Sequence, residues 1–337
     1  MRVLIVKLSS LGDVVHALPV VADLRAAHPG VAVDWVVEPG FAPIVRRCGG
    51  IAEVIDCPLR RWTRDGLWTR AVRAEIAAFA RRLRRERYDA VVDLQGLTKS
   101  VLVARLARGP SFGLANRTRG SSHEWPARAL VGTAIRVEPH SHALDRSREL
   151  VAKALGTRID TRPDFGLAPA GATSSDALPP PRSVAFLHGS SRADKLWPEA
   201  HWIDLGRRLI AAGRTIALPQ SGREEQERAE RIAAALGTGT GAGTSAGAVE
   251  VWPALDLGAF IDRLAGTGGA IGVDSGPSHI AVALGLPHVQ IYNFATAWRT
   301  GPQARHGAMH QRSIEGTPTP SVDDVLAAWQ DVAANAS

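Results

Sequence analysis

One loop design occurs twice in this chain and constrains its fold more than any other feature. In both copies a short apolar strand runs into a turn that is rich in Ser and Gly and carries one Asp, and a helix follows. The first copy spans residues 2–13 and the second spans residues 269–279. In an open parallel sheet, ligands bind just beyond the carboxyl ends of the strands, where small residues let the backbone approach and helix N-termini attract anions. Two such loops therefore predict two facing half-sites.

The length of the chain indicates two domains. Its 337 residues exceed what one hydrophobic core usually fills. We expect an N-terminal domain over residues 1–160, a linker rich in Pro, Ala and Ser over residues 161–182, and a C-terminal domain over residues 183–318. The last segment, residues 319–337, is expected to form a helix that packs back on the N-terminal domain.

Strands and helices alternate in both halves. In the first half, apolar runs predict strands over 2–8, 32–37, 53–56, 89–94 and 111–115, and helical spacing predicts helices from about 13 and over 41–47, 70–86, 98–107 and 143–155. In the second half the strands are expected over 183–187, 214–218, 249–251, 269–273 and 288–292, and the helices over 198–212, 223–236, 257–265 and 276–284. Pro19, one turn inside the first helix, should bend it or shift its start. Repeated βα units predict an α/β fold with a doubly wound parallel sheet in each half.

The positive charge of the chain is concentrated in one segment. The net charge is +7, and residues 60–87 contain ten arginines against three acidic residues. We expect a helix with a solvated arginine face over the second half of this segment and a loop over residues 59–64. Guanidinium groups suit phosphates and carboxylates, so Arg60, Arg61 and Arg64 are interpreted as an anion site, with a solvated surface as the plain alternative.

Several classes of protein and site are not indicated. No run approaches the ~20 apolar residues of a membrane span, and no segment fits a signal peptide, so we expect a cytoplasmic chain. Cys48 and Cys57 are interpreted as reduced thiols, because two cysteines provide neither a disulfide framework nor a metal quartet. Residues 237–247 have the composition of a linker and are interpreted as a surface loop rather than a dinucleotide motif. No pattern of metal ligands is present in the sequence, so no metal is expected.

The turn after the strand at 183–187 is well suited to a diphosphate. It carries Ser190, Ser191 and Lys195, and the helix that follows is expected to have Pro198 at its first position. Hydroxyl groups, a glycine and a lysine on such a turn would cradle phosphate oxygens.

A second turn in the same half adds to this prediction. Asp274, Ser275 and Gly276 end a strand and open a helix, whose N-terminal N–H groups attract anions. Either turn alone could be a plain connection, but the two together favour a phosphate site. Glu225, early in helix 223–236, either accepts hydrogen bonds from ribose hydroxyls or compensates the helix dipole.

Five segments, in order along the chain, resemble the lipopolysaccharide heptosyltransferases of glycosyltransferase family 9, and in particular the type I enzymes. They are residues 7–19 (KLSSLGDVVHALP), 59–62 (LRRW), 93–96 (DLQG), 186–198 (FLHGSSRADKLWP) and 273–279 (VDSGPSH). The resemblance implies a GT-B fold, in which two Rossmann-like domains face each other across a cleft, with the acceptor on the N-terminal one and the nucleotide sugar on the C-terminal one.

The resemblance also implies a reaction. This is an inverting transfer of L-glycero-D-manno-heptose from ADP-L-glycero-β-D-manno-heptose to Kdo2-lipid A, a step of lipopolysaccharide inner-core biosynthesis. It uses no metal and no cofactor and takes place at the cytoplasmic face of the inner membrane.

On the acceptor side, the resemblance makes Asp13 the general base that deprotonates the Kdo hydroxyl, for which it has to lie within ~3 Å of the proton. A Gly-Asp pair before a helix is otherwise an N-cap. The resemblance also implies that Lys7, Ser10 and Gly12 position the acceptor. Arg60, Arg61 and Arg64 would meet Kdo carboxylates or lipid phosphates, and the basic segment would provide peripheral membrane contact.

On the donor side, the resemblance gives Ser190, Ser191 and Lys195 to the diphosphate, with Lys195 also offsetting charge on the departing ADP. Ser275 and Gly276 would add N–H groups, Asp274 would bind heptose hydroxyls and Glu225 the ribose. His279 would either approach the phosphate or pack. The two serines stand where the family often has threonines, and Leu255 stands where a methionine is expected against adenine.

Two alternatives stay open. A type II heptosyltransferase would share the donor site but act on heptosyl-Kdo2-lipid A; residues 9–13 and the Arg60 cluster favour the type I reaction. A nucleic-acid-binding protein would use the net charge of +7, but that charge falls in one segment without aromatic residues interleaved along a groove, so no nucleic acid partner is expected.

Overall fold

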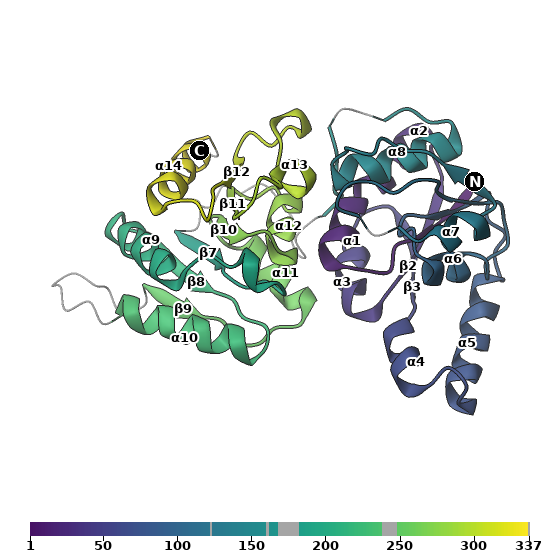
Figure 1. Ribbon diagram of the computed structural model, residues 1–337, viewed down its shortest axis with the longest axis horizontal. Helices are drawn as coiled ribbons and strands as arrows, with labels where there is room; N and C mark the ends of the chain where they lie inside the picture. Colours follow the sequence, from purple (N-terminus) through teal and green to yellow (C-terminus); the bar gives the residue numbers. More distant parts are fainter. Residues whose placement is uncertain (122, 160–161, 168–181, 238–247, 336–337) are drawn as a thin grey trace. The chain divides into compact units, whose positions relative to one another are not determined.

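The chain forms two compact α/β units, Met1–Ala168 and Pro169–Ser337. The computed structural model describes residues 1–121, 123–159, 162–167, 182–237 and 248–335. In each unit a parallel sheet is flanked by helices (Figure 1). Most of the expected linker, and the expected surface loop beyond Gly237, lie outside the described residues.

The first unit is built on a six-stranded sheet with the order β3-β2-β1-β4-β5-β6, in which all neighbours are parallel. The strands are β1 (Arg2–Val6), β2 (Ala32–Val37), β3 (Ile51–Asp56), β4 (Ala90–Asp93), β5 (Ser111–Leu114) and β6 (Thr133–Ile135). The helices are α1 (Leu11–Ala17), α2 (Pro19–Ala27), η1 (Pro39–Phe41), α3 (Ala42–Arg46), α4 (Leu59–Asp65), α5 (Arg70–Leu83), α6 (Thr98–Ala104), α7 (Trp125–Leu130) and α8 (Ala143–Leu155).

The second unit repeats this arrangement. Its parallel sheet has the order β12-β11-β10-β7-β8-β9, which is the same 3-2-1-4-5-6 order read from the other edge. The strands are β7 (Ser183–Leu187), β8 (Thr215–Leu218), β9 (Val249–Val251), β10 (Ala270–Val273), β11 (His288–Tyr292) and β12 (Gln311–Glu315). The helices are η2 (Ala193–Lys195), α9 (Glu199–Ala211), α10 (Arg223–Gly237), α11 (Leu257–Ala265), α12 (Gly276–Ala283), α13 (Ala297–Thr300), η3 (Ala304–His306) and α14 (Val322–Ala334).

The predicted α/β class with a doubly wound parallel sheet in each half is confirmed. The first helix begins at Leu11, before Asp13, and Pro19 divides it: α1 ends at Ala17 and Pro19 is the first residue of α2. Proline is favoured there because the first helical N–H has no partner within the helix. Pro198 lies one position earlier than expected, at the N-cap of α9.

The prediction of a loop over residues 59–64 is wrong. Leu59–Asp65 is helix α4, whose single buried side chain, Trp62, packs edge-on against Phe79 of α5 with ring centroids 5.5 Å apart. Leu59 and Trp62 are the two apolar residues of this segment, too few to establish a helical period, and the short helix is stabilised by packing. The elements α7, β6, α13 and β12 were not predicted either.

The last helix differs from expectation in its packing. The buried residues of α14 belong to the core of the second unit, where Val325 and Trp329 join Trp202 of α9 and Val289 of β11. We expected this helix to pack on the first domain. Its apolar face instead completes the cover of its own sheet.

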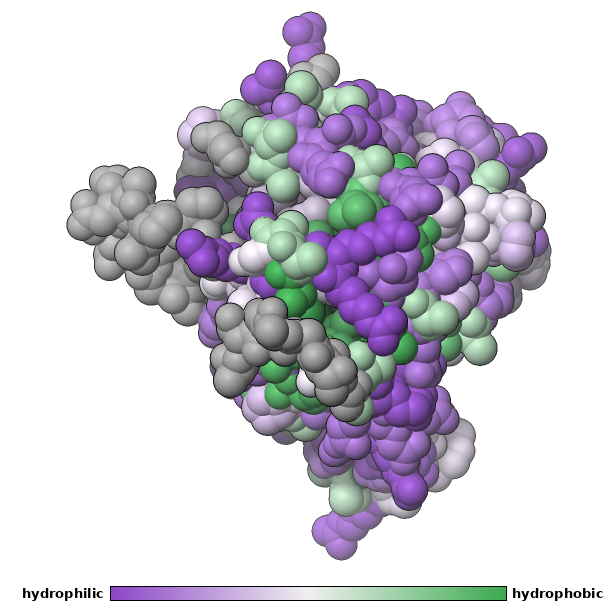
Figure 2. Space-filling view, turned by 90° about the vertical axis from the view of Figure 1, so that its left-hand side faces the viewer, coloured by the Kyte–Doolittle hydropathy of each residue, from purple (hydrophilic) through white to green (hydrophobic). Residues whose placement is uncertain are grey.

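On the face of the molecule shown in Figure 2, hydrophilic residues predominate and hydrophobic ones gather near the centre. In the parts of the chain that the structure describes, no helix has both the length and the apolar character needed to cross a bilayer.

Candidate active site

Each sheet has one point at which the strand order reverses. It lies between β1 and β4 in the first unit and between β7 and β10 in the second. In open α/β sheets, ligands bind outside the carboxyl ends of the strands at this switch point, because the loops there diverge. The two repeated loop designs follow β1 and β10, so each lies at the switch point of its own unit.

Asp13 lies in the first turn of α1. Ser10 is the N-cap of this helix, and its backbone N–H and Oγ donate to Asp13 Oδ2 at 3.3 and 2.9 Å. The other carboxylate oxygen, Oδ1, lies 3.8 Å from Nη2 of Arg146. The side chain is 38% exposed. Asp13 therefore takes part in capping through one oxygen, and its carboxylate stays within reach of a substrate.

The charges around Asp13 keep it ionised. Burial tends to raise the pKa of this carboxyl, but Lys7, Arg146 and the hydrogen bonds from Ser10 outweigh it, so the pKa lies below its ordinary value. Arg146 belongs to α8; its side chain is 6% exposed, and its Nη1 also donates to Thr118 Oγ1 at 3.3 Å. Asp13 is therefore ionised at neutral pH, the form in which a carboxylate can accept a proton.

Lys7 links the loop after β1 to the loop after β4. It is buried, and its ammonium group donates to the carbonyl of Leu94 at 3.2 Å. Burial lowers the pKa of Lys7, while Asp13 opposes that effect. On this geometry Lys7 holds the β1 and β4 loops together and supplies positive charge near Asp13.

The loop after β4 shapes the same site. Gln95 Oε1 accepts from the backbone N–H groups of Leu8 and Ser9, both at 3.2 Å. Asp93 is fully buried and accepts from Gln95 N at 2.9 Å and Ser100 Oγ at 3.0 Å. Burial raises the pKa of Asp93 to about 6. This network fixes the backbone that leads into Ser10.

The three arginines predicted as an anion site lie on α4 and have different surroundings. Arg61 pairs with Glu75 of α5, whose Oε2 also accepts from the indole N–H of Trp62 at 2.8 Å. Arg60 lies over the ring of Phe41 at 5.6 Å, and Arg64, with a 75% exposed side chain, pairs with the adjacent Asp65. Arg61 thus joins α4 to α5, whereas Arg60 and Arg64 present their guanidinium groups at the surface.

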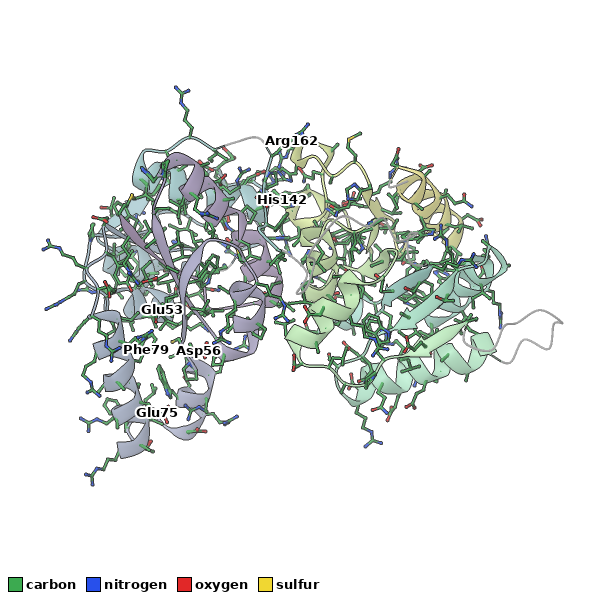
Figure 3. All side chains as sticks on the ribbon, turned by 180° about the vertical axis from the view of Figure 1, so that it is seen from behind. Glu53, Asp56, Glu75, Phe79, His142 and Arg162 are labelled. Carbon is green, nitrogen blue, oxygen red and sulfur yellow. The ribbon has the colours of Figure 1, made fainter. Side chains whose placement is uncertain are left out.

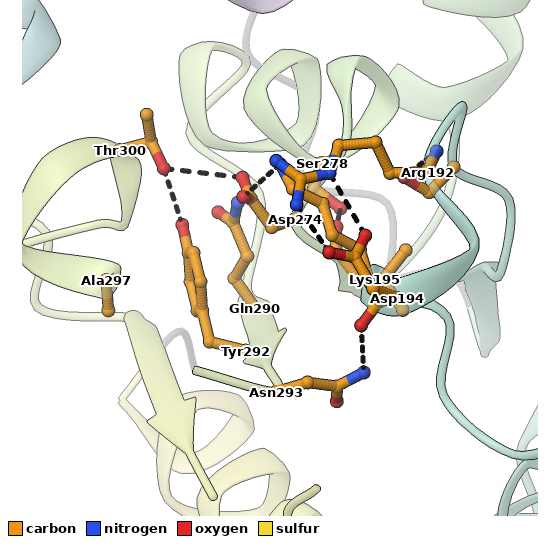
Figure 4. Close-up of polar contacts among 12 residues, drawn as sticks. Arg192, Asp194, Lys195, Asp274, Ser278, Gln290, Tyr292, Asn293, Ala297 and Thr300 are labelled. Atoms are coloured by element: carbon orange, nitrogen blue, oxygen red, sulfur yellow. Dashed lines mark hydrogen bonds and ion pairs between the residues drawn. The ribbon is translucent and has the colours of Figure 1, made fainter. Parts of the chain in front are cut away.

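In the second unit, Asp274 is the centre of a buried polar cluster (Figure 4). Its Oδ2 lies 2.5 Å from the Nζ of Lys195, and its Oδ1 accepts from Thr300 Oγ1 at 3.3 Å and lies 3.4 Å from Nε2 of His279. Burial tends to raise the pKa of Asp274, but His279 and Lys195 outweigh it and hold the pKa well below its ordinary value. The structure therefore brings together three of the predicted donor residues, Lys195, Asp274 and His279.

The start of α12 faces the same cluster. Ser275 is its N-cap and Gly276 its first residue. The Oγ of Ser275 is buried and has no hydrogen-bond partner among the described residues. A buried hydroxyl without a partner is costly unless a ligand or water pairs with it, and a helix N-terminus suits an anion.

The remaining donor candidates surround these loops. Ser190 Oγ accepts from the N–H of Arg192 at 3.3 Å, and Ser191 is exposed. Glu225 Oε2 accepts from Ser221 N and Oγ at 2.8 and 2.9 Å, and a Cβ added to Gly189 would lie 2.1 Å from its Oε1. Leu255 is half-buried between β9 and α11. Glu225 therefore lies beside the glycine of the predicted phosphate turn.

Some residues of the candidate site were not predicted from the sequence. Arg146 lies in a helix with an amphipathic sequence pattern, where an arginine is expected to face water. The local sequence therefore gave no indication that Arg146 is buried beside Asp13. Thr300 is the last residue of α13, and Asn293 directly follows β11. Asn293 Nδ2 donates to the carbonyls of Asp194 and Leu196 at 2.9 and 3.0 Å and so fixes the turn that carries Lys195. Gln95 was visible only as part of the DLQG segment.

Groups of three or more His, Cys, Asp or Glu side chains placed to hold a metal ion do not occur among the residues described. Two Rossmann-like units in one chain, each with polar loops at the switch point of its sheet, are the arrangement found in glycosyltransferases of the GT-B class.

Comparison with known proteins identifies the family. The model of glycosyltransferase family 9 (heptosyltransferase) matches residues 76–327. Lipopolysaccharide heptosyltransferase 1 from Escherichia coli K12 is 39% identical over 296 residues, which cover 87% of this chain and 88% of that protein. Lipopolysaccharide heptosyltransferase 2 from the same organism is 25% identical over 329 residues, 94% of this chain and 89% of that protein.

A solved structure agrees with this result. The E. coli heptosyltransferase WaaC with ADP matches with a TM-score of 0.84 at 33% identity, covering 98% of this chain and 100% of that one. The chain belongs to glycosyltransferase family 9, the heptosyltransferases, and has the GT-B fold. The resemblance seen in the sequence is confirmed, and the type 2 enzyme is the more distant of the two relatives.

Proposed function

We propose that this chain transfers L-glycero-D-manno-heptose from ADP-heptose to a Kdo hydroxyl of Kdo2-lipid A, with inversion at the anomeric carbon. The observation that carries the proposal is the contrast between the two switch points. One presents a partly exposed, ionised carboxylate, and the other presents a buried Asp–Lys pair beside a helix N-terminus. The first suits a base and the second suits a sugar diphosphate.

Asp13 is the general base in this proposal. The acceptor hydroxyl gives its proton to Asp13 while its oxygen forms a bond to the anomeric carbon of heptose. The bond from that carbon to the β-phosphate oxygen breaks, and the electron pair leaves with ADP. The lowered pKa of Asp13 means that the base is already ionised before the acceptor arrives.

Lys195 stabilises the leaving group, ADP, in this proposal. Its side chain is 20% exposed, so the ammonium group can move from Asp274 to a phosphate oxygen without leaving the site. We propose that Lys195, rather than a metal ion, offsets the negative charge that develops on ADP. Asp274 then accepts hydrogen bonds from heptose hydroxyls, since its low pKa keeps it ionised.

The other residues of the proposed donor site bind the remaining parts of the nucleotide sugar. The N–H groups of Ser275 and Gly276 and the hydroxyls of Ser190 and Ser191 bind the diphosphate. Glu225 binds the ribose and Leu255 the adenine, and His279, whose Nε2 lies 3.4 Å from Asp274 Oδ1, either approaches the phosphate or packs. These roles follow the family resemblance.

The acceptor contributes acidic groups of its own. Arg60 and Arg64 would meet Kdo carboxylates or lipid phosphates, with Arg61 holding their helix in place. Ser10 and Gly12 position the reacting hydroxyl, and Lys7 orders their loop. The basic segment would keep the chain in peripheral contact with the cytoplasmic face of the inner membrane.

The experiment is ADP release in five samples: ADP-heptose with Kdo2-lipid A, ADP-heptose with heptosyl-Kdo2-lipid A, ADP-heptose alone, and each of the two acceptors alone. The proposal requires rapid release only in the first mixture. Release that needs the heptosylated acceptor would assign the type II reaction, and release without any acceptor would show hydrolysis instead of transfer.

A further inference from the structure

The turn between α4 and α5 exposes two apolar side chains. Leu67 is 42% exposed and Trp68 is 89% exposed. The N–H of Thr69 donates to the carbonyl of Gly66 at 3.1 Å, which makes residues 66–69 a tight turn with Leu67 and Trp68 at its two central positions. Gly66 has a φ of +91°, which favours glycine at the first position of this turn.

The turn is held by both helices. Thr69 caps α5, and its Oγ1 donates back to the carbonyl of Gly66 at 2.9 Å. Glu75 and Phe79 lie on the side of α5 that faces α4 (Figure 3), where they meet Arg61 and Trp62. The apolar contacts between the helices are thus made by other residues, which leaves the Trp68 indole to solvent.

Basic residues surround these two side chains. Between Leu59 and Arg73 the chain has five arginines and one acidic residue. Arg70 and Arg73 on α5, like Arg60 and Arg64 on α4, are exposed. In the first unit, α4 and α5 project together away from the sheet (Figure 1). An exposed Trp–Leu pair at the tip of an arginine-rich hairpin matches the chemistry of an anionic lipid surface, where indole rings settle at the boundary of headgroups and acyl chains.

We propose that Leu67 and Trp68 insert into the headgroup boundary of an anionic bilayer while the arginines of the hairpin contact lipid phosphates. The inference rests on the proposed function in one respect: an acceptor anchored in a membrane requires the enzyme to work at that surface. It adds an apolar anchor to the basic contact, and it assigns that anchor to a turn outside the reacting groups.

The test is cosedimentation of the full chain with vesicles of phosphatidylcholine and phosphatidylglycerol, compared with vesicles of phosphatidylcholine alone. Binding is expected to require the anionic lipid and to weaken roughly tenfold in Trp68→Ala, because a large aromatic side chain no longer enters the apolar boundary. Trp125→Ala is the matched control, since Trp125 is 74% exposed on α7 and is not part of the α4–α5 hairpin, and binding should be unchanged. Unchanged binding of Trp68→Ala, or equal loss in both variants, would overturn the proposal.

A second measurement separates this proposal from the catalytic one. With a deacylated, water-soluble acceptor, Trp68→Ala should release ADP at the wild-type rate, and with acceptor embedded in anionic vesicles it should be slower. A wild type that binds vesicles through Trp68 but transfers no heptose would contradict the proposed function alone. Equal slowing with both acceptors would place Trp68 in the active site and contradict the anchor.

Discussion

The two carboxylates to which the proposal gives different roles have different surroundings. Asp13 is partly exposed and has two cationic neighbours, Lys7 and Arg146, that oppose the effect of burial on its pKa. Asp274 is only 6% exposed and has Lys195 and His279 in direct contact. Both are ionised at neutral pH, but only Asp13 combines that charge with access for a substrate hydroxyl.

Replacing Asp13 by Asn should lower turnover by roughly 10²- to 10⁴-fold, which is the usual contribution of a general base, and should leave ADP-heptose affinity nearly intact. ADP release and calorimetric titration of the donor measure the two quantities. Asp256→Asn is the matched control, because Asp256 caps α11 by accepting from Ala259 N at 2.9 Å. If both variants lose turnover equally, capping rather than catalysis explains the role of Asp13.

Arg146 should set the pH at which the base loses its charge. Removing this cation in Arg146→Met takes away one of the groups that lower the pKa of Asp13, so that pKa rises. The acidic limb of the kcat profile, where Asp13 becomes protonated, should therefore move to higher pH, and Arg146→Lys should restore part of the shift. Arg128→Met, at an exposed position on α7, should leave the profile unchanged. A limb that stays in place in Arg146→Met would contradict the assignment.

Lys195→Ala should weaken ADP-heptose binding, because it removes the cation that faces the diphosphate. It also leaves Asp274 without its ion-pair partner, so the pKa of Asp274 rises. Calorimetric titration with ADP-heptose measures the loss of affinity. Arg192→Ala, which removes an exposed arginine paired with Asp194, is the comparison and should bind the donor nearly as the wild type does. Equal affinity in Lys195→Ala and the wild type would remove Lys195 from the donor site.

At the scale of elements, the donor loop depends on close contact between β10, β7 and α12. A Cβ added to Gly272 would lie 2.3 Å from Ser278 Oγ and 2.7 Å from Leu187 Cβ. Ser278 Oγ donates to the carbonyl of Val273 at 2.6 Å and so ties the first turn of α12 to the end of β10. The glycine therefore allows the helix N-terminus to approach the strand.

Gly272→Ala should lower the free energy of unfolding by about 1–3 kcal/mol, the usual cost of overpacking, and should weaken ADP-heptose binding by displacing α12. Urea unfolding and donor titration report these two effects. Gly40→Ala is the control, since a Cβ at Gly40 meets no atom within 4 Å. Tolerance of alanine at position 272 in both assays would show that the helix does not need this contact.

The elements also show where prediction from sequence succeeded and where it could not. Strands such as β1 and β10 are largely continuous apolar runs because both faces of a parallel sheet are covered, and they were predicted closely. β12 is an edge strand whose residues are only partly buried, so QRSIE carries no strong pattern. The contact between Arg146 and Asp13 joins residues far apart in the chain, and only the fold brings them together.

At the scale of the whole molecule, charge and chemistry are distributed over the two units. The excess of arginine lies on the α4–α5 hairpin of the first unit, where an acidic, lipid-linked acceptor would be met. The proposed nucleotide-sugar site belongs to the second unit, at the switch point of a sheet with the same strand order. In the proposed mechanism, one fold used twice therefore provides a base for one substrate and a diphosphate site for the other.

The central claim is that this chain joins heptose from ADP-heptose to Kdo2-lipid A through Asp13. The most direct measurement is the mass of the lipid product after incubation of both substrates with the wild type and with Asp13→Asn. The wild type should convert the acceptor to a species heavier by one heptose, and Asp13→Asn should give almost none at equal time. An acceptor of unchanged mass with the wild type, or equal conversion by the variant, would contradict the account.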